Sequence, residues 1–306
     1  MSDPLSDVLS LLDVESARCT RLEAGGRWSL SFPAKPALKF AAALRGRCWI
    51  SLPGAAPQAL EAGDTFLLAH APAYVMANDL EMTPHDGLAL FDDGRAETAH
   101  HGGNETVLIA GSFQFRGGGA GLLLDALPPF IHIRSGDPAG AVLRATLELL
   151  DVELHTPRMG SSLMARRLGD ILLLQALRAF ADGPGGRDSG AGWIAALGDP
   201  RIGAALRLIH ADPGRRWTVA ALAAGAGLSR SGFALRFKDR VGAAPLDYVI
   251  RWRMQLARDA LRRPDASVAE LAARLGYASE SAFGNAFKRT FGAAPKRYWK
   301  SVAAGD

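Results

Sequence analysis

Two stretches of the C-terminal third repeat one order of hydrophobic and polar positions, about fifty residues apart. Residues 219–248 and 268–298 carry the same apolar residues and glycines, and both contain the sequence Gly-Ala-Ala-Pro. The matched pairs are Val219 and Val268, Leu222 and Leu271, Gly227 and Gly276, Phe233 and Phe283, and Phe237 and Phe287. A repeat at fixed spacing indicates one supersecondary unit used twice.

Each copy has the pattern of two short helices joined by a glycine turn. In the second copy, Ser267 and Glu270 match a capping box, and Gly276 can adopt the left-handed conformation that ends a helix. Ser279 is then predicted to cap a helix whose phenylalanines face a core. The equivalent positions in the first copy are Thr218, Gly227 and Ser229. Residues 217–242 and 267–292 are therefore predicted to be two helix-turn-helix units.

The residues outside the phenylalanine face of each second helix are the candidate DNA-binding residues. They are Arg230, Ser231, Ala234, Leu235 and Lys238 in the first copy, and Glu280, Ser281, Gly284, Asn285 and Lys288 in the second. Asn285 could form paired hydrogen bonds to adenine, and Arg230 could contact guanine or phosphate. Lys238 and Lys288 are expected to contact phosphates. The alternative is that both faces are ordinary solvated surface. The occurrence of two such faces on the two matching helices disfavours this alternative.

The charge distribution supports a nucleic-acid partner for the C-terminal part. Residues 193–306 contain 19 Lys and Arg against 9 Asp and Glu, whereas residues 1–192 contain 16 against 22. A basic segment joined to a mildly acidic one is typical of a chain with a DNA-binding domain at one end.

Residues 200–299 resemble the DNA-binding domain of AraC/XylS-type bacterial transcription regulators. The resemblance rests on the paired units, Trp217-Thr218, Phe237-Lys238, Phe287-Lys288, Gly276-Tyr277 and the two Gly-Ala-Ala-Pro-x-x-Tyr endings. It implies that the partner is double-stranded DNA, that both heads enter successive major grooves, and that the protein contacts RNA polymerase, with activation as the expected sign. It also implies a long connecting helix, here from Pro245 to about Leu261.

The first two thirds contain a short amphipathic helix over residues 1–15, followed by short apolar runs between Gly and Pro residues. Strands are predicted at 28–32, 39–44, 48–52, 64–68, 73–76, 106–110, 112–115 and 130–133. Strands this short indicate a sandwich or jelly-roll barrel, and residues 60–68 resemble the Ala-Gly-Asp strand start of cupin barrels. The expected fold is thus α+β and multidomain, with a cupin-like sensor barrel (1–135), a helical linker or dimerisation segment (136–182) and an all-α DNA-binding domain (193–306).

Helices are predicted at 141–150 and 163–180. The second is apolar around its whole circumference over 171–177, so it must be buried on several sides. Packing against the barrel and a second subunit would achieve this and predicts a homodimer; a purely intramolecular core helix is the alternative. Residues 182–192 have the composition of a flexible linker.

Two functions are compatible with the N-terminal part. The favoured one is a non-enzymatic sensor of a small molecule or an oxidant, without a cofactor; the alternative is a metal-dependent cupin enzyme fused to a DNA-binding tail. The His-x-His set of cupin enzymes is missing, and His100 and His101 would face opposite sides of a strand, which leaves His70 and His85 as candidate ligands. Five aromatic residues could line a ligand cavity or fill the core: Trp28, Phe40, Trp49, Phe66 and Tyr74.

The two cysteines, Cys19 and Cys48, suit a reducing cytoplasm and exclude a disulfide scaffold. Cys19 lies between Arg18 and Arg21 in the sequence, and neighbouring positive charge lowers a thiol pKa. Redox sensing through Cys19, paired with Cys48, is therefore a hypothesis that requires α-carbons within about 7 Å. The N-terminus lacks a basic region typical of signal peptides, and no run of eighteen uncharged apolar residues occurs, so no membrane partner and a cytoplasmic location are expected.

Overall fold

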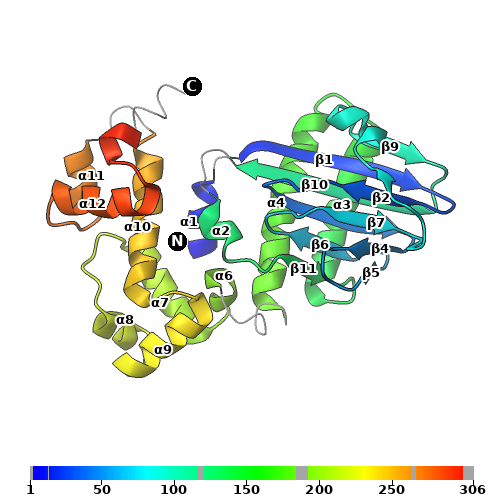
Figure 1. Cartoon of the computed structure of the whole chain (residues 1–306). Coiled ribbons are helices and arrows are strands. Elements are labelled where there is room, and N and C mark those ends of the chain that lie inside the picture. Colours follow the sequence, from blue (N-terminus) through cyan, green and yellow to red (C-terminus); the bar gives the residue numbers. More distant parts are fainter. Residues whose placement is uncertain (1–2, 13, 116–119, 184–191, 263–266, 299–306) are drawn as a thin grey trace. The chain divides into compact units, whose positions relative to one another are not determined.

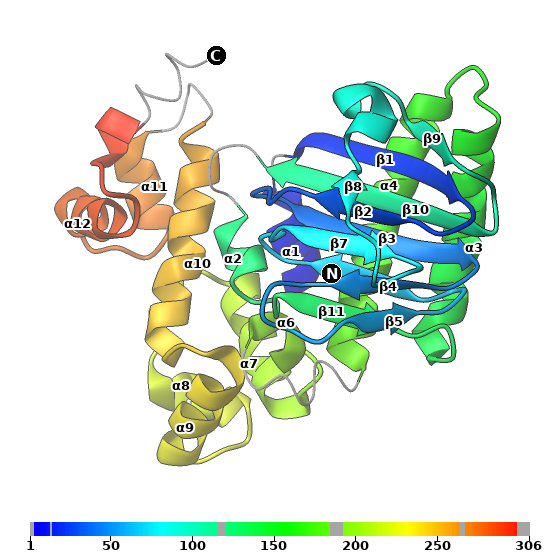
Figure 2. The same ribbon diagram turned by 45° about the vertical axis from the view of Figure 1, so that its right-hand side comes forward.

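The chain divides into two compact units in the computed structural model, residues 14–189 and residues 190–306 together with 1–13. The structure describes residues 3–12, 14–115, 120–183, 192–262 and 267–298. Figures 1 and 2 show the β-rich unit and the helical unit with their element labels. The linker predicted at 182–192 falls largely outside the described residues.

The β-rich unit contains two sheets. The strands are β1 (Val14–Ala24), β2 (Ser29–Phe32), β3 (Leu38–Arg45), β4 (Cys48–Ser51), β5 (Gln58–Leu60), β6 (Thr65–Leu68), β7 (Tyr74–Ala77), β8 (His85–Asp86), β9 (Thr98–His101), β10 (Thr106–Phe115) and β11 (Phe130–Ile133). The six-stranded sheet has the order β11-β6-β3-β10-β1-β9, and the five-stranded sheet has the order β5-β4-β7-β2-β8. A short 3₁₀ helix, η1 (Ala89–Gly94), and a short α-helix, α2 (Gly121–Leu124), lie between strands.

Apolar side chains from both sheets form one core between them, as expected for a cupin-like fold. Trp28, Phe66 and Tyr74 belong to this core. Phe40 is buried against Phe113 instead, with ring centroids 6.0 Å apart, and its neighbours in β3 face the core, so it points to the opposite side of the sheet. The candidate aromatic residues therefore do not line one common cavity. Trp49 is half-buried beneath the guanidinium of Arg47.

Two long helices, α3 (Pro138–His155) and α4 (Ser161–Asp182), cover the outer face of the six-stranded sheet (Figures 1 and 2). Both pack against β1. The segment 136–182, expected to be a separate linker, is thus part of the β-rich unit. Of the run predicted to be buried on all sides, Leu172, Leu173, Ala176 and Leu177 are buried, but Ile171 is 45% exposed.

The N-terminal segment differs from the prediction in two ways. The helix α1 spans only Pro4–Ser10, and β1 starts at Val14 and pairs along its length with β10. The helix α1 also belongs to the helical unit rather than to the sensor domain assigned as 1–135. Its apolar residues Leu5 and Val8 are buried, and Asp7 lies 3.3 Å from His210. The β-rich unit therefore begins at residue 14 and not at residue 1.

The helical unit otherwise follows the predicted order. Its helices are α6 (Trp193–Ala196), α7 (Pro200–Ala211), α8 (Val219–Gly225), α9 (Arg230–Val241), α10 (Pro245–Ala260), α11 (Val268–Arg274) and α12 (Glu280–Phe291). The predicted connecting helix is α10, which runs from the α8/α9 pair to the α11/α12 pair (Figure 1). No helix among the described residues is long and apolar enough to span a membrane.

Candidate nucleic-acid interface

The two helix-turn-helix units have identical helix lengths. The first helices, α8 and α11, contain seven residues each, and the second helices, α9 and α12, contain twelve each. The repeat in the sequence therefore corresponds to a repeat in the backbone, and the prediction of two units is confirmed.

All four helices begin at the predicted caps. Hydroxyl oxygens of Thr218, Ser229, Ser267 and Ser279 accept hydrogen bonds from backbone N–H groups three residues later, at 3.1 to 3.4 Å. Each bond satisfies a donor that lacks a partner within the helix. The helices α9 and α12 both end at the glycine of Gly-Ala-Ala-Pro, Gly242 and Gly292, in the left-handed conformation.

The candidate DNA-binding residues lie on the side of α9 and α12 away from the core. The phenylalanines Phe233, Phe237, Phe283 and Phe287 are fully buried. The candidates that are exposed are Arg230, Ser231, Leu235 and Lys238 on α9, and Glu280, Ser281, Asn285 and Lys288 on α12, whereas Ala234 and Gly284 are partly buried. Glu280 lies 3.6 Å from the ammonium group of Lys296.

Leu235 and Gly284 are the most informative of these positions. The Leu235 side chain is 74% exposed, the largest exposed fraction of any large apolar residue described in the helical unit. A Cβ at Gly284 would meet no atom within 4 Å, so nothing within the chain requires glycine there. An apolar side chain in solvent and an open backbone on matching helices are features that a DNA partner would explain.

The two helix-turn-helix units are held together by a close backbone contact and by one arginine. A Cβ at Gly276 would lie 2.1 Å from the carbonyl oxygen of Gly214, so the turn of the second unit packs directly on the loop that precedes the first. Arg253 of α10 donates to the carbonyl oxygens of Pro213 and Arg215, at 2.7 and 2.8 Å, and its guanidinium lies over the Tyr277 ring. This junction restricts how the two second helices are oriented relative to each other.

His210 forms a buried polar cluster behind the first unit. Its Nε2 lies 2.9 Å from the Tyr248 hydroxyl, its Nδ1 lies 3.3 Å from Asp7, and its ring stacks on Trp252 with centroids 4.1 Å apart. A neutral imidazole satisfies both contacts if Nδ1–H donates to Asp7 and Nε2 accepts from Tyr248. Burial lowers the pKa of His210, against the opposing effect of the Asp7 and Asp3 carboxylates.

Two exposed arginines of the helical unit were not among the predicted DNA-binding residues. Arg215 and Arg216 are both exposed directly before the first unit, and Arg215 lies over the Trp217 ring at 4.4 Å. The Arg-Arg-Trp sequence was the signal that could have identified them. Arg236 is a different case, because its guanidinium donates to Asp199 at 2.7 Å and so links α9 to the start of α7.

In the β-rich unit, the candidate metal ligands His70 and His85 do not belong to a group of side chains that could hold a metal ion among the described residues. His70 is exposed and lies 3.4 Å from Asp125, and His85 is exposed on β8. Within the described residues, no group of three or more His, Cys, Asp or Glu side chains is arranged to hold a metal ion.

The expected low pKa of Cys19 is wrong. Burial, with Asp170 and Glu97 nearby, raises the pKa of this thiol to about 12, and burial raises that of Cys48 to about 12 as well. The guanidinium of Arg21 is paired with Glu23 and Asp151, and that of Arg18 donates to the carbonyl oxygen of Ala96. The Cys19 thiol faces α4, 3.6 Å from the carbonyl oxygen of Ala165, whereas Cys48 lies in the core between the sheets. Burial thus disfavours the thiolate form on which redox sensing through these cysteines would depend.

Comparisons with known proteins agree with both units. Residues 3–182 match the family model described as "Cupin", and residues 222–301 match that described as "Helix-turn-helix domain". A protein of Streptomyces antibioticus named "Putative AraC-like transcription regulator" is 41% identical, over 97% of this chain and 98% of that protein. A protein of the same name from Streptomyces lividans is 40% identical over the same shares. The solved DNA-binding domain of AdpA in complex with a target DNA is 32% identical, with a TM-score of 0.33 over 34% of this chain and 94% of that one. The chain belongs to the AraC-like transcription regulators and combines an N-terminal cupin domain with a C-terminal helix-turn-helix domain that binds DNA.

Proposed function

We propose that α9 and α12 are the recognition helices, and that each reads base edges in the major groove. The observation that carries this proposal is the matched outward face of two helices of equal length. The base-reading residues are Arg230, Ser231, Ala234 and Leu235 on α9, and Ser281, Gly284 and Asn285 on α12. The chemistry of several fits: an exposed leucine suits a thymine methyl group, and asparagine suits the paired donor and acceptor of adenine.

Lys238 and Lys288 take the role of phosphate contacts in this proposal. Both are exposed in the last turn of their helices. A lysine ammonium group binds a phosphate as a point charge, and such contacts release counterions from the DNA. Affinity should therefore fall steeply with salt, and Lys288→Ala should reduce that salt dependence by about one unit of slope.

The experiment for base reading compares Asn285→Ala with Thr290→Ala on a DNA site selected with the wild-type protein. Asn285 faces outward, whereas the Thr290 hydroxyl donates to the Ala286 carbonyl on another side of the same helix. Asn285→Ala should weaken binding by about 1–3 kcal/mol, and Thr290→Ala should leave it nearly unchanged. Equal affinities for wild type and Asn285→Ala would reject base reading by this residue.

We propose further that the protein is a homodimer that associates through α3 and α4. These helices expose a set of large apolar side chains on the β-rich unit: Val142, Leu149, Val152, Leu163, Met164 and Ile171. Exposed large apolar side chains on two helices that pack against each other favour an interface on this face. Ile171 is the exposed member of the helix segment that the sequence predicted to be covered on all sides.

Light scattering tests the dimer. The wild-type mass should be twice the 32.4 kDa of one chain, and Leu149→Glu should be monomeric because a charge would be buried without a partner. Leu80→Glu is the control, since Leu80 is comparably exposed but lies outside α3 and α4. A wild-type monomer at micromolar concentration would reject the interface.

We also propose that the cupin domain senses a small molecule in the cytoplasm, where the DNA lies, and that the protein activates transcription by contacting RNA polymerase. The relatives named as regulators support sensing over catalysis. Metal analysis of the purified protein tests this against the alternative of a cupin enzyme, because stoichiometric iron, manganese or zinc would favour the enzyme. In vitro transcription with purified polymerase tests the sign of regulation.

A further inference from the structure

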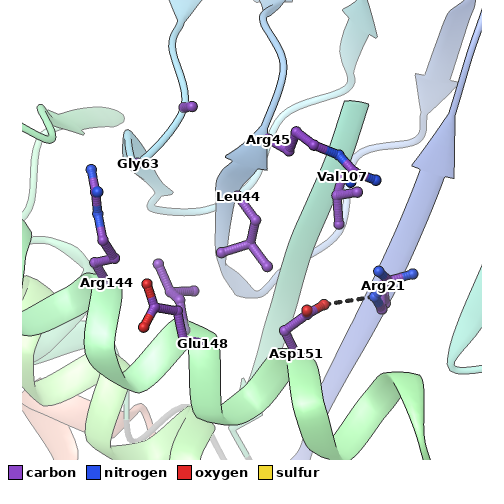
Figure 3. A pocket seen from close by; sticks show the side chains of 10 residues that line it. Arg21, Leu44, Arg45, Gly63, Val107, Arg144, Glu148 and Asp151 are labelled. Atoms are coloured by element: carbon purple, nitrogen blue, oxygen red, sulfur yellow. Dashed lines mark hydrogen bonds and ion pairs between the residues drawn. The ribbon is translucent and has the colours of Figure 1, made fainter. Parts of the chain in front are cut away.

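A cavity of about 320 Å³ lies between the outer face of the six-stranded sheet and α3 (Figure 3). It is separate from the core between the two sheets, because its walls come from the helix-facing side of the strands and from Arg144, Leu147, Glu148 and Asp151 of α3. A volume of this size is at the lower end of the range for small-molecule sites.

The floor of the cavity is built around a buried cation. Arg21 is only 4% exposed, and its guanidinium donates to Asp151 at 2.6 Å and to Glu23 at 2.5 Å. These two carboxylates keep the pKa of Arg21 above its ordinary value, so the arginine remains charged. Both acids are thereby engaged by Arg21, and Glu23 also lies 2.7 Å from Nδ1 of His100.

Two further arginines line the cavity and lack such a partner. Arg45, at the end of β3, and Arg144, on α3, are exposed, and neither guanidinium has a hydrogen bond or an ion pair within the parts of the chain that the structure describes. In Figure 3 they lie on opposite sides of Leu44. Two unpaired guanidinium groups are thus separated by an apolar wall, to which Val107 and Leu147 also contribute.

Gly63 makes room for one of these groups. A Cβ at this position would lie 2.5 Å from Nη2 of Arg144, and the backbone φ of +92° is in the region that favours glycine. Any larger residue would therefore push the Arg144 guanidinium away from its place at the wall of the cavity.

We propose that this cavity binds a small dicarboxylate, with one carboxylate on Arg45, the other on Arg144, and the aliphatic spacer against Leu44 and Val107. A guanidinium fork matches a carboxylate with two parallel hydrogen bonds. The volume and the apolar wall suit a small ligand with a short aliphatic spacer. This inference rests on the proposed sensing role, for which it names the ligand class.

Glu148 is the one lining acid not engaged by Arg21. It lies one helical turn after Arg144, so its negative charge opposes the binding of an anion. Removal of that charge should therefore strengthen dicarboxylate binding, whereas removal of either arginine should weaken it. These opposite signs distinguish a ligand site from a surface whose arginines only improve solubility.

The test is thermal unfolding of the full-length protein with succinate, glutarate or adipate, against sodium chloride of equal ionic strength. At a ligand concentration ten times Kd, the cupin domain should melt roughly 3–6 °C higher. Arg45→Gln and Arg144→Gln should each weaken binding by about tenfold or more, and Glu148→Gln should strengthen it several-fold. Arg166→Gln, an exposed arginine on α4, is the matched control and should retain the wild-type shift.

Two results would overturn the proposal: no shift with any of the three dicarboxylates, or the same shift in Arg45→Gln and Arg144→Gln as in wild type. Melting curves without ligand verify that both variants fold. DNA affinity is measured separately with and without the ligand that binds. A ligand shift that depends on both arginines but leaves DNA affinity unchanged would support the site while refuting its role in sensing.

Discussion

Replacement of Gly276 by alanine tests the junction that joins the two helix-turn-helix units. Gly276 has a φ of +75°, and a Cβ there would be 2.1 Å from the carbonyl oxygen of Gly214 and 2.9 Å from its carbonyl carbon. A left-handed backbone costs alanine about 1–2 kcal/mol, and backbone shifts that relieve overpacking cost about 1–3 kcal/mol more. Gly276→Ala should therefore destabilise the helical unit by about 2–5 kcal/mol.

Gly292→Ala is the matched control for this substitution. Gly292 has the same φ of +75°, but a Cβ there would meet nothing within 4 Å, so only the backbone strain of about 1–2 kcal/mol remains. Native-state hydrogen exchange of the α11 and α12 amides reports the stability of this unit separately from the cupin domain. DNA affinity should also fall more for Gly276→Ala, because α12, the proposed second recognition helix, would shift. Equal destabilisation by the two substitutions would refute the close contact with Gly214.

Two further predictions concern buried titratable groups. Burial holds the pKa of His210 below its ordinary value near 6.5. The stabilising effect of the neutral imidazole is therefore complete above about pH 6.5 and decreases at lower pH, where the unfolded chain binds the proton first. Urea unfolding between pH 7.5 and 5 should show this loss of stability, and His210→Gln should reduce the slope of stability against pH. An unchanged slope would assign the pH dependence to other groups. The Cys19 thiol, with its pKa of about 12, should react with iodoacetamide at pH 8 at least a hundredfold more slowly than a free thiol, and Cys19→Ser should leave the response of DNA binding to peroxide unchanged. Rapid alkylation, or loss of a peroxide response in Cys19→Ser, would restore the redox hypothesis.

The helix-turn-helix units could be predicted in detail because their signals are local. Caps such as Ser229 and Ser279, helix-ending glycines such as Gly276, and phenylalanines one helical turn apart each act within a few residues. The repeat then supplied an independent second copy of every signal. Side-chain directions on α9 and α12 follow from the helical period alone, so eight of the ten predicted outward positions are exposed, and only Ala234 and Gly284 are partly buried.

The strand β1 was missed because its stability depends on a distant residue. The sequence places charged Arg21 and Glu23 where a strand covered by helices would need apolar side chains. Asp151 on α3 pairs with Arg21 across 130 positions of sequence, so the charge can be buried. No pattern within β1 indicates this partner.

The docking of α1 and the environment of Cys19 were unpredictable for the same reason. Asp7 contacts His210 across 203 positions of sequence, which the amphipathic pattern of the N-terminal helix does not indicate. Arg18 and Arg21 are neighbours of Cys19 in sequence, but the thiol pKa is determined by burial against α4 and by Asp170. Proximity in sequence was therefore a poor guide to the electrostatics of the folded chain.

Both helices, α9 and α12, are proposed to read one DNA duplex. The most direct measurement is selection of binding sites from random duplexes with the wild-type protein, Leu235→Ala and Asn285→Ala. The wild-type site should contain two specified segments about one helical turn, or 10 bp, apart. Leu235→Ala should relax the preference in one segment only, and Asn285→Ala in the other only. A wild-type site with a single specified segment, or two variants that alter the same base pairs, would contradict the account.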